Sequence, residues 1–178
     1  MNIDITFNFY SDSNGGDPDL KSPTLRKYHQ FLWHKRLPNG DFMDLSDTPS
    51  NLVEFGKNEI TLSSAAMPPI YFYNAKDGLL EEFSNNGLPL GSLRNEEYVL
   101  EKRKFSQGDV LVQFSDGLPE APNLADELYD YDRLKSLIQN SCHLSAKEII
   151  DTLVKSVDEW MQGRPNPDDI TLVVTKKK

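Results

Sequence analysis

The stretch GDVLVQFSDG, residues 108–117, joins a run of apolar residues to an Asp-Gly turn. Its middle part, Val110–Phe114, is rich in β-branched and aromatic residues, a composition typical of a strand in the core of a sheet. Such a strand delivers Asp116 to the turn at its end. A second stretch, NPDDITLVV at residues 166–174, has the reverse order, with two adjacent aspartates before an apolar run. The sequence therefore predicts two core strands with carboxylates at their ends.

Outward from these strands, the pattern predicts two β-hairpins upstream and one further alternating strand. The hairpin turns are Gly-Lys-Asn and Asp-Gly, both typical turn sequences. The expected strands are Leu52–Phe55, Glu59–Ser63, Ile70–Tyr73, Leu79–Phe83, Tyr98–Phe105, Val110–Phe114 and Ile170–Thr175.

Two helices are expected between the last two strands. The first covers Tyr131–Gln139, and the second follows the capping box Ser145–Glu148 and continues to Met161 with a broad apolar stripe. Strands followed by two helices and one more strand predict an α+β fold, with a largely antiparallel sheet and both helices on one face.

The first 51 residues differ in texture from the rest. They contain one strand-like run, Ile3–Tyr10, and a short helical pattern over residues 22–33, with Ser22 as N-cap and Pro23 in the first turn. Turn-rich segments surround both, and the segment has too little apolar surface to fold alone. We therefore expect an N-terminal appendage over residues 1–51 and a main domain over residues 52–178.

Composition restricts the classes of function. The chain has 178 residues, with 28 Asp and Glu against 19 Lys and Arg, and a net charge of −9. An acidic chain argues against a nucleic-acid partner, and the one basic run, Lys176–Lys178, is interpreted as a tail. No stretch is long and apolar enough to span a membrane, and no signal peptide is evident, so we expect a cytoplasmic protein without a membrane partner.

The cysteine and histidine content excludes several kinds of metal site. Cys142 is the only cysteine, and the three histidines are scattered, so neither a cysteine cage nor a histidine-rich zinc site can form. Any metal must be held by carboxylates. Mg²⁺ and Mn²⁺ prefer such oxygen ligands, so Asp116 and Asp168 are candidates. The alternative is structural: Asp-Gly is a common turn and Asp-Asp a polar strand cap.

Six motifs follow one another along the chain: SAAMPPIYF (64–72), GLPLG (87–91), GDVLV (108–112), SDGLPEA (115–121), SAKEII (145–150) and DDIT (168–171). They resemble the C-terminal part of the SpoIIE/RsbU-like branch of the PPM (PP2C-type) protein phosphatases, over about Leu52–Lys178. The resemblance implies an antiparallel β-sandwich with flanking helices, here incomplete, and a binuclear Mn²⁺ or Mg²⁺ site at which water attacks phosphoserine or phosphothreonine.

The resemblance also implies roles for single residues. Asp116 and Asp168 look like metal ligands, and Gly117 leaves room beside the site. Asp169 looks like a residue that supports these ligands or caps the strand.

The chain departs from the family in its N-terminal part. The family there carries a Gly-Asp-Phe/Tyr-x-Asp motif and an Asp-x-x-Gly-His-Gly element that contact both metals, and no stretch of this sequence matches the latter. Residues 39–44, NGDFMD, imitate the former, so Asp41 and Asp44 are further candidate ligands; the alternative is a Pro-Asn-Gly-Asp turn. Residues 1–48 instead resemble the opening of an uncharacterised bacterial family.

These observations lead to two functional hypotheses. The first is a metal-dependent serine/threonine phosphatase domain, truncated or impaired because the missing element would hold the second ion and the attacking water. The alternative is a non-catalytic pseudophosphatase module in bacterial signalling, which binds a phosphoprotein or a regulator. An apolar sheet face that the first 50 residues cover only in part would favour self-association.

Other single residues have less specific interpretations. His29 and His34 are expected at the surface or in caps. Cys142 fits a buried small hydrophobe better than a nucleophile. Arg164 is interpreted as an exposed loop arginine, with phosphate binding as the alternative.

Overall fold

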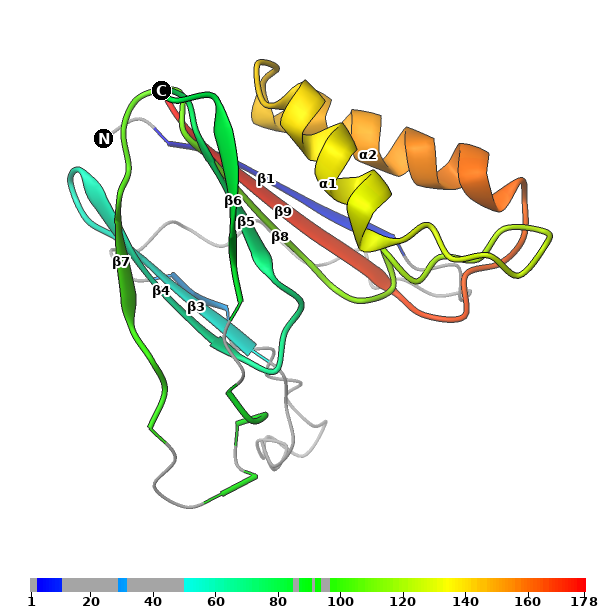
Figure 1. Ribbon diagram of the computed structural model, residues 1–178, viewed down its shortest axis with the longest axis horizontal. Helices are drawn as coiled ribbons and strands as arrows, with labels where there is room; N and C mark the ends of the chain where they lie inside the picture. The colour runs from blue at the N-terminus through cyan, green and yellow to red at the C-terminus, as the bar shows by residue number, and fades with distance from the viewer. Residues whose placement is uncertain (1–2, 11–28, 32–49, 85–86, 91, 94–96) are drawn as a thin grey trace, which may run out of the picture. The chain divides into compact units, whose positions relative to one another are not determined.

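A computed structural model of the chain describes residues 3–10, 29–31, 50–84, 87–90, 92–93 and 97–178. Within these residues the fold consists of two antiparallel sheets and two helices (Figure 1). The chain divides into two compact units, one formed by residues 1–21, 68–83 and 106–178 and the other by residues 22–67 and 84–105. The predicted α+β class and antiparallel pairing are confirmed.

The sheet of the first unit has five strands in the order β1-β9-β8-β5-β6. Every neighbouring pair is antiparallel, and β8 lies in the middle with all five of its residues buried. That central position explains the largely apolar sequence Val110–Phe114, in which Gln113 is the one polar residue. The strands are β1 (Ile3–Tyr10), β5 (Ile70–Asn74), β6 (Leu79–Phe83), β8 (Val110–Phe114) and β9 (Ile170–Lys177).

Two helices, α1 (Tyr131–Ser141) and α2 (Ala146–Met161), lie side by side over one face of this sheet (Figure 1). Helix α2 packs on β9 and β1, and α1 contacts β6 and α2. The predicted capping box is present, since Ser145 and Glu148 exchange side-chain and backbone hydrogen bonds. The apolar stripes of both helices enter one core with the strands, formed in part by Val112, Phe114, Leu134, Ile138, Ile149, Leu153, Val157, Leu172 and Val174.

The sheet of the second unit has the order β2-β3-β4-β7. Its centre is the predicted hairpin, closed by a hydrogen bond from the Gly56 amide to the Glu59 carbonyl at 2.8 Å. Val53, Ile60, Leu62 and Phe105 are fully buried in the described part of the chain. The strands are β2 (His29–Phe31), β3 (Ser50–Phe55), β4 (Glu59–Ala65) and β7 (Glu101–Lys104), so the strand predicted over Tyr98–Phe105 is shorter than expected.

The N-terminal segment follows the sequence prediction only in part. The strand over Ile3–Tyr10 is confirmed and pairs with β9 along its whole length. The helix predicted over residues 22–33 is wrong at His29–Phe31, which form β2 and pair with β3; the remainder of that pattern lies outside the described residues. A short helical pattern yields here to the hydrogen bonds that the edge of β3 offers. The division at residue 51 stays a prediction, although strands from both sides of it share each sheet.

The basic run at the end of the chain is not a tail. Lys176 and Lys177 belong to β9, and the Lys176 ammonium donates hydrogen bonds to the Cys142 carbonyl at 2.7 Å and the Leu144 carbonyl at 2.6 Å. Cys142 is the C-cap residue of α1. Carbonyl groups at a helix C-terminus lack partners within the helix and carry partial negative charge, so a cation stabilises them. Lys176 therefore ties the α1–α2 turn to the sheet.

Replacing Lys176 with methionine is expected to lower the free energy of unfolding by about 1–3 kcal/mol, because two carbonyls lose a charged donor. The matched control is Lys155→Met, which removes only an exposed ion pair with Glu159 at 3.7 Å and should change stability by less than about 0.5 kcal/mol. Urea denaturation followed by circular dichroism measures both values. Equal stabilities of the two variants would contradict the role of Lys176.

A buried carboxylate organises the chain just before β8. Asp109 is 3% exposed, and its two oxygens accept hydrogen bonds from the Ala75 amide at 2.9 Å and the Ser106 amide at 2.6 Å. Its backbone also pairs with Lys177 of β9. Asp109 thus connects the β5–β6 turn, the turn before β8 and the end of β9.

Candidate functional site

The end of β8 is joined to the start of β9 by a serine side chain. Regular pairing ends at Phe114 and Leu172, and the Ser115 amide still donates to the Thr171 carbonyl at 2.9 Å. The Ser115 hydroxyl then accepts from the Thr171 amide at 2.8 Å and donates to the Asp169 carbonyl at 2.9 Å. The ladder is thereby extended by a side chain, which fixes the backbone of the Asp-Asp segment beside the Asp-Gly turn.

Gly117 brings the two aspartate motifs into contact. It is buried, and a Cβ built on it would lie 2.6 Å from the carbonyl oxygen of Asp169 and 3.3 Å from the carbonyl carbon of Asp168. Only a residue without a side chain allows this approach, which explains the glycine better than turn geometry does. The family expectation, that Gly117 leaves room beside the site, stays a prediction.

Asp116 and Asp168 are both exposed at this junction. One oxygen of each carboxylate accepts a hydrogen bond from the next residue's amide, at 3.0 Å from Gly117 and 2.8 Å from Asp169. Neither second oxygen accepts a hydrogen bond from a described residue. The structure therefore places both candidate ligands on touching backbone segments, with a carboxylate oxygen of each open to a ligand.

Asn166 joins the same junction, a contact that the sequence did not predict. Its Nδ2 atom donates to the Gly117 carbonyl at 2.8 Å. Its Oδ1 atom is buried and has no hydrogen-bond partner among the described residues. No sequence signal distinguishes Asn166, or Ser115, from an ordinary loop residue, because their partners lie about 50 positions away in the chain.

Negative charge gathers near Asp116. Tyr131, the first residue of α1, packs on Phe114 with ring centroids 6.3 Å apart. Burial raises the pKa of the Tyr131 hydroxyl above its usual value, and the carboxylates of Glu120, Asp116 and Glu82 raise it further. An anionic surrounding of this kind favours a cation at the site and disfavours an anionic ligand without one.

Arg164 has a structural role. Its guanidinium donates to the Asn123 carbonyl at 2.6 Å and pairs with Asp126. It thereby ties the loop before α1 to the loop before β9. These partners already engage the guanidinium. The structure therefore favours neither interpretation of Arg164 from the sequence, an exposed loop arginine or a phosphate-binding residue.

The remaining sequence candidates are Asp41, Asp44, the histidines and Cys142. Asp41, Asp44 and His34 lie outside the described residues. Cys142 is 1% exposed, and burial raises the pKa of its thiol to about 12, so its interpretation as a buried small hydrophobe is confirmed. In the described ranges, no group of three or more His, Cys, Asp or Glu side chains could hold a metal ion.

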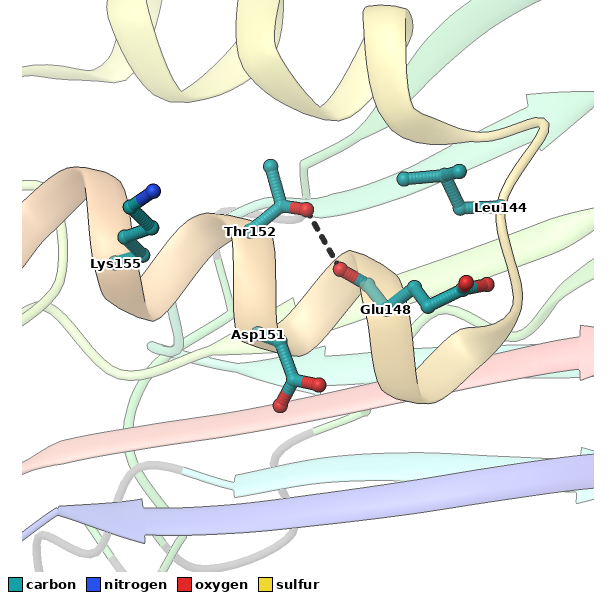
Figure 2. Close-up of a pocket in the computed structure, with 5 residues that line it drawn as sticks. All are labelled: Leu144, Glu148, Asp151, Thr152 and Lys155. Atoms are coloured by element: carbon teal, nitrogen blue, oxygen red, sulfur yellow. Dashed lines mark hydrogen bonds between the residues drawn. The ribbon is translucent and has the colours of Figure 1, made fainter.

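A shallow groove of about 320 Å³ lies elsewhere, along α2 (Figure 2). Leu144, Glu148, Asp151, Thr152 and Lys155 line it, and the Thr152 hydroxyl donates to the Glu148 carbonyl at 2.7 Å. Leu144 is held by Lys176 near the end of β9, whereas Asp168 precedes the start of that strand. The Leu144 end of the groove and the aspartates thus lie towards opposite ends of β9.

Two family models match the sequence. Residues 49–178 match the family Stage II sporulation protein E (SpoIIE). Residues 3–90 match a family of unknown function (DUF6994). The two matches overlap over residues 49–90, which include β3, β4, β5 and β6. Separately, none of the helices in the described ranges is long and apolar enough to cross a membrane.

Individual relatives agree with the first match. Phosphoserine phosphatase RsbU of Bacillus subtilis is 30% identical over 125 residues, which are 68% of this chain and 36% of RsbU. The fold is similar to the SiaA-PP2C domain of Pseudomonas aeruginosa, with a TM-score of 0.64 and 17% identity, covering 73% of this chain and 52% of that one. It is also similar to the manganese-soaked SpoIIE phosphatase domain of Bacillus subtilis, with a TM-score of 0.54 and 16% identity, covering 73% and 56%. This chain therefore spans about a third of RsbU and about half of each solved domain.

Proposed function

We propose that this chain, which belongs to the SpoIIE family, is a metal-dependent phosphoserine/phosphothreonine phosphatase domain with impaired turnover. The observation that supports the proposal most directly is the contact of the two aspartate motifs through Gly117. If the Asp-Gly turn and the Asp-Asp cap were purely structural, the two motifs would not need to touch. A shared site does require this contact. The relative RsbU is named a phosphoserine phosphatase, which supports the substrate class.

Asp116 and Asp168 would hold a Mn²⁺ or Mg²⁺ ion, with Asp169 supporting the segment that carries Asp168. The site fits such an ion in its chemistry, because its open groups are carboxylate oxygens in an anionic surrounding. A cation bound there would neutralise charge on a phosphoryl group and lower the pKa of a water molecule. Contacts of Ser115 and Gly117 hold together the two backbone segments that carry Asp116 and Asp168.

Impaired turnover is proposed for a chemical reason. Each divalent ion needs about six oxygen ligands, and the described residues offer no cluster of three carboxylates or imidazoles. The sequence has no Asp-x-x-Gly-His-Gly element to supply more. These observations also support the second candidate, a pseudophosphatase module that binds a phosphoprotein or a signalling regulator without hydrolysing it. Self-association, a cytoplasmic location and the absence of nucleic-acid partners stay predictions from the sequence.

The test compares Asp116→Asn and Asp168→Asn with the parent protein in Mn²⁺ binding and in Mn²⁺-dependent hydrolysis of a phosphoserine peptide. Each variant is expected to weaken Mn²⁺ binding at least tenfold, because a negatively charged ligand becomes neutral. Hydrolysis by the parent is expected to be slow and to fall below detection in both variants. Electron paramagnetic resonance of free Mn²⁺ gives the affinities.

The control variant is Asp151→Asn, which removes an exposed carboxylate that pairs with Lys147 within α2. Its Mn²⁺ affinity should equal that of the parent. If all three variants bind Mn²⁺ equally well, the aspartate pair is not the cation site. If the parent binds Mn²⁺ through the aspartates without any hydrolysis, the pseudophosphatase candidate is favoured.

A further inference from the structure

We propose that the hairpin over residues 121–129, together with Tyr131, is a docking surface for a partner protein, which it contacts through a segment that combines apolar side chains with lysine or arginine. The proposal goes beyond the proposed phosphatase activity and does not rest on it, since it involves neither a cation nor a phosphoryl group. It is carried by apolar side chains exposed on a fixed backbone and by the charge around them.

Exposed apolar side chains gather at this hairpin. Eight large apolar side chains are exposed in the described part of the chain, and three of them lie within residues 124–131. Leu124 is 66% exposed, Leu128 51% and Tyr131 39%. Single exposed leucines are common on monomeric proteins, whereas grouped ones are typical of interaction surfaces. The grouping, and not the exposure of any one residue, therefore distinguishes this hairpin.

The two strands of the hairpin are paired by their backbones. The Tyr129 amide donates to the Ala121 carbonyl at 2.9 Å, and the Asn123 amide donates to the Glu127 carbonyl, also at 2.9 Å. The Asn123 side chain closes the turn, because its Oδ1 atom accepts from the Ala125 amide at 2.8 Å and the Glu127 amide at 3.0 Å. The turn between the leucines therefore has a defined conformation.

Two side chains from outside the hairpin hold its first strand. The Trp160 Nε1 atom donates to the Ala121 carbonyl at 3.2 Å, and the Arg164 guanidinium donates to the Asn123 carbonyl at 2.6 Å. A loop held in this way loses little conformational freedom when a partner binds, so more of the apolar contact contributes to affinity.

The segment around the hairpin is acidic. Residues 116–132 contain no lysine, arginine or histidine, and all of their acidic residues are exposed. Arg164 pairs with Asp126, and the Arg133 guanidinium lies over the Trp160 ring, 3.8 Å from its centroid. These two arginines offset only part of the negative charge. The acidic residues of the segment are Asp116, Glu120, Asp126, Glu127, Asp130 and Asp132.

This charge selects the occupant of the surface. Apolar side chains among carboxylates favour a partner segment in which apolar residues stand beside lysine or arginine, because complementary charges speed the encounter and like charges suppress it. The same carboxylates repel nucleic acids and anionic membrane surfaces. A second copy of this chain has the same hairpin and a net charge of −9, which opposes its approach. A basic, apolar segment of another protein is therefore the occupant that fits.

The test measures binding of a fluorescein-labelled peptide of alternating leucine and lysine to the full chain by fluorescence anisotropy, without added metal. Leu124→Ser together with Leu128→Ser is expected to weaken binding at least about tenfold, because the apolar contacts are lost. The matched control is Leu79→Ser together with Leu100→Ser, which changes two leucines of similar exposure elsewhere and should leave the affinity unchanged. Urea denaturation shows whether each variant remains folded.

The contribution of charge is tested separately. Glu120→Gln together with Asp132→Asn is expected to weaken binding about threefold to tenfold and to reduce its dependence on salt. The control, Asp151→Asn together with Glu159→Gln, removes the same amount of charge from exposed positions of α2 and should bind the peptide as the parent does. A peptide of alternating leucine and glutamate should not bind the parent.

The outcomes decide between occupants. Weakened binding in the hairpin variants alone supports the proposal, and the charge variants decide if the leucine variant does not fold. Parent-like affinity in the hairpin variants, equal weakening by the controls, or no binding to the parent overturns it. A parent that sediments as a dimer, and that Leu124→Ser with Leu128→Ser converts to a monomer, also overturns it, because a second copy then covers the hairpin. Since the assay contains neither metal nor phosphopeptide, its result is independent of whether Asp116 and Asp168 hold a cation.

Discussion

Replacing Asp109 with alanine is expected to lower the free energy of unfolding by about 3–5 kcal/mol, the largest stability effect that we predict. The substitution leaves the part-buried amides of Ala75 and Ser106 without an acceptor, and each such loss costs about 1–3 kcal/mol. It also removes a charge-assisted contact from the point where three segments meet. Because a domain of this size has a total stability of about 5–15 kcal/mol, a large part of that stability is at stake.

Urea denaturation of Asp109→Ala and Asp109→Asn measures this effect. Asparagine retains one acceptor but turns an NH₂ group towards the second amide, so its stability should lie between those of the parent and the alanine variant. The control is Asp77→Ala, which removes an exposed carboxylate of the β5–β6 turn and should cost less than about 1 kcal/mol. An Asp109→Ala protein as stable as the control would show that the two amides find other partners.

Replacing Gly117 with alanine is expected to weaken Mn²⁺ binding at least tenfold and to destabilise the fold by about 1–3 kcal/mol. The new methyl group would lie 2.6 Å from the Asp169 carbonyl oxygen and 3.0 Å from its carbonyl carbon, both backbone atoms that cannot rotate away. The segment that carries Asp168 must therefore move. That movement also strains the hydrogen bond from Asn166 to the Gly117 carbonyl.

A second glycine variant separates the clash from a general effect of the substitution. Gly78 has a φ of 68°, and a Cβ there meets no atom within 4 Å, so Gly78→Ala introduces backbone strain without a collision. It should cost about 1 kcal/mol of stability and leave Mn²⁺ affinity unchanged. Parent-like Mn²⁺ affinity in Gly117→Ala would mean that the packing of the two motifs has no bearing on cation binding.

The parts of the fold that the sequence predicts well are those with a local cause. The run Val110–Phe114 is largely apolar because β8 is central, and the capping box before α2 is a contact between residues three positions apart. The hairpins have turn sequences between their strands. In each case the residues that specify the element also form it, so pattern and structure coincide.

The parts that were missed depend on distant partners. The β2 strand exists through its pairing with β3, which outweighs a short helical pattern. Lys176 belongs to a basic run at the chain end, and its role becomes visible only when the α1–α2 turn lies above β9. At the candidate site, the aspartates could be found by motif, whereas Ser115 and Asn166 act through hydrogen bonds to segments about 50 positions away. Neither residue type has a periodicity or spacing that predicts such a contact.

The pairing of β1 with β9 sets the order in which the first sheet can assemble. Its partners extend from Tyr10–Ile170 to Ile3–Lys177, so they are separated by 160 (170 − 10) to 174 (177 − 3) positions, against 58 (172 − 114) to 66 (176 − 110) for β8 with β9. Contacts between such remote segments form slowly, because the intervening chain must close first. During synthesis, β1 is made before the other strands of this sheet, but it can pair only after β9 has been made. Until it arrives, the outer edge of β9 exposes unpaired amides and carbonyls that a strand of another nascent chain can reach.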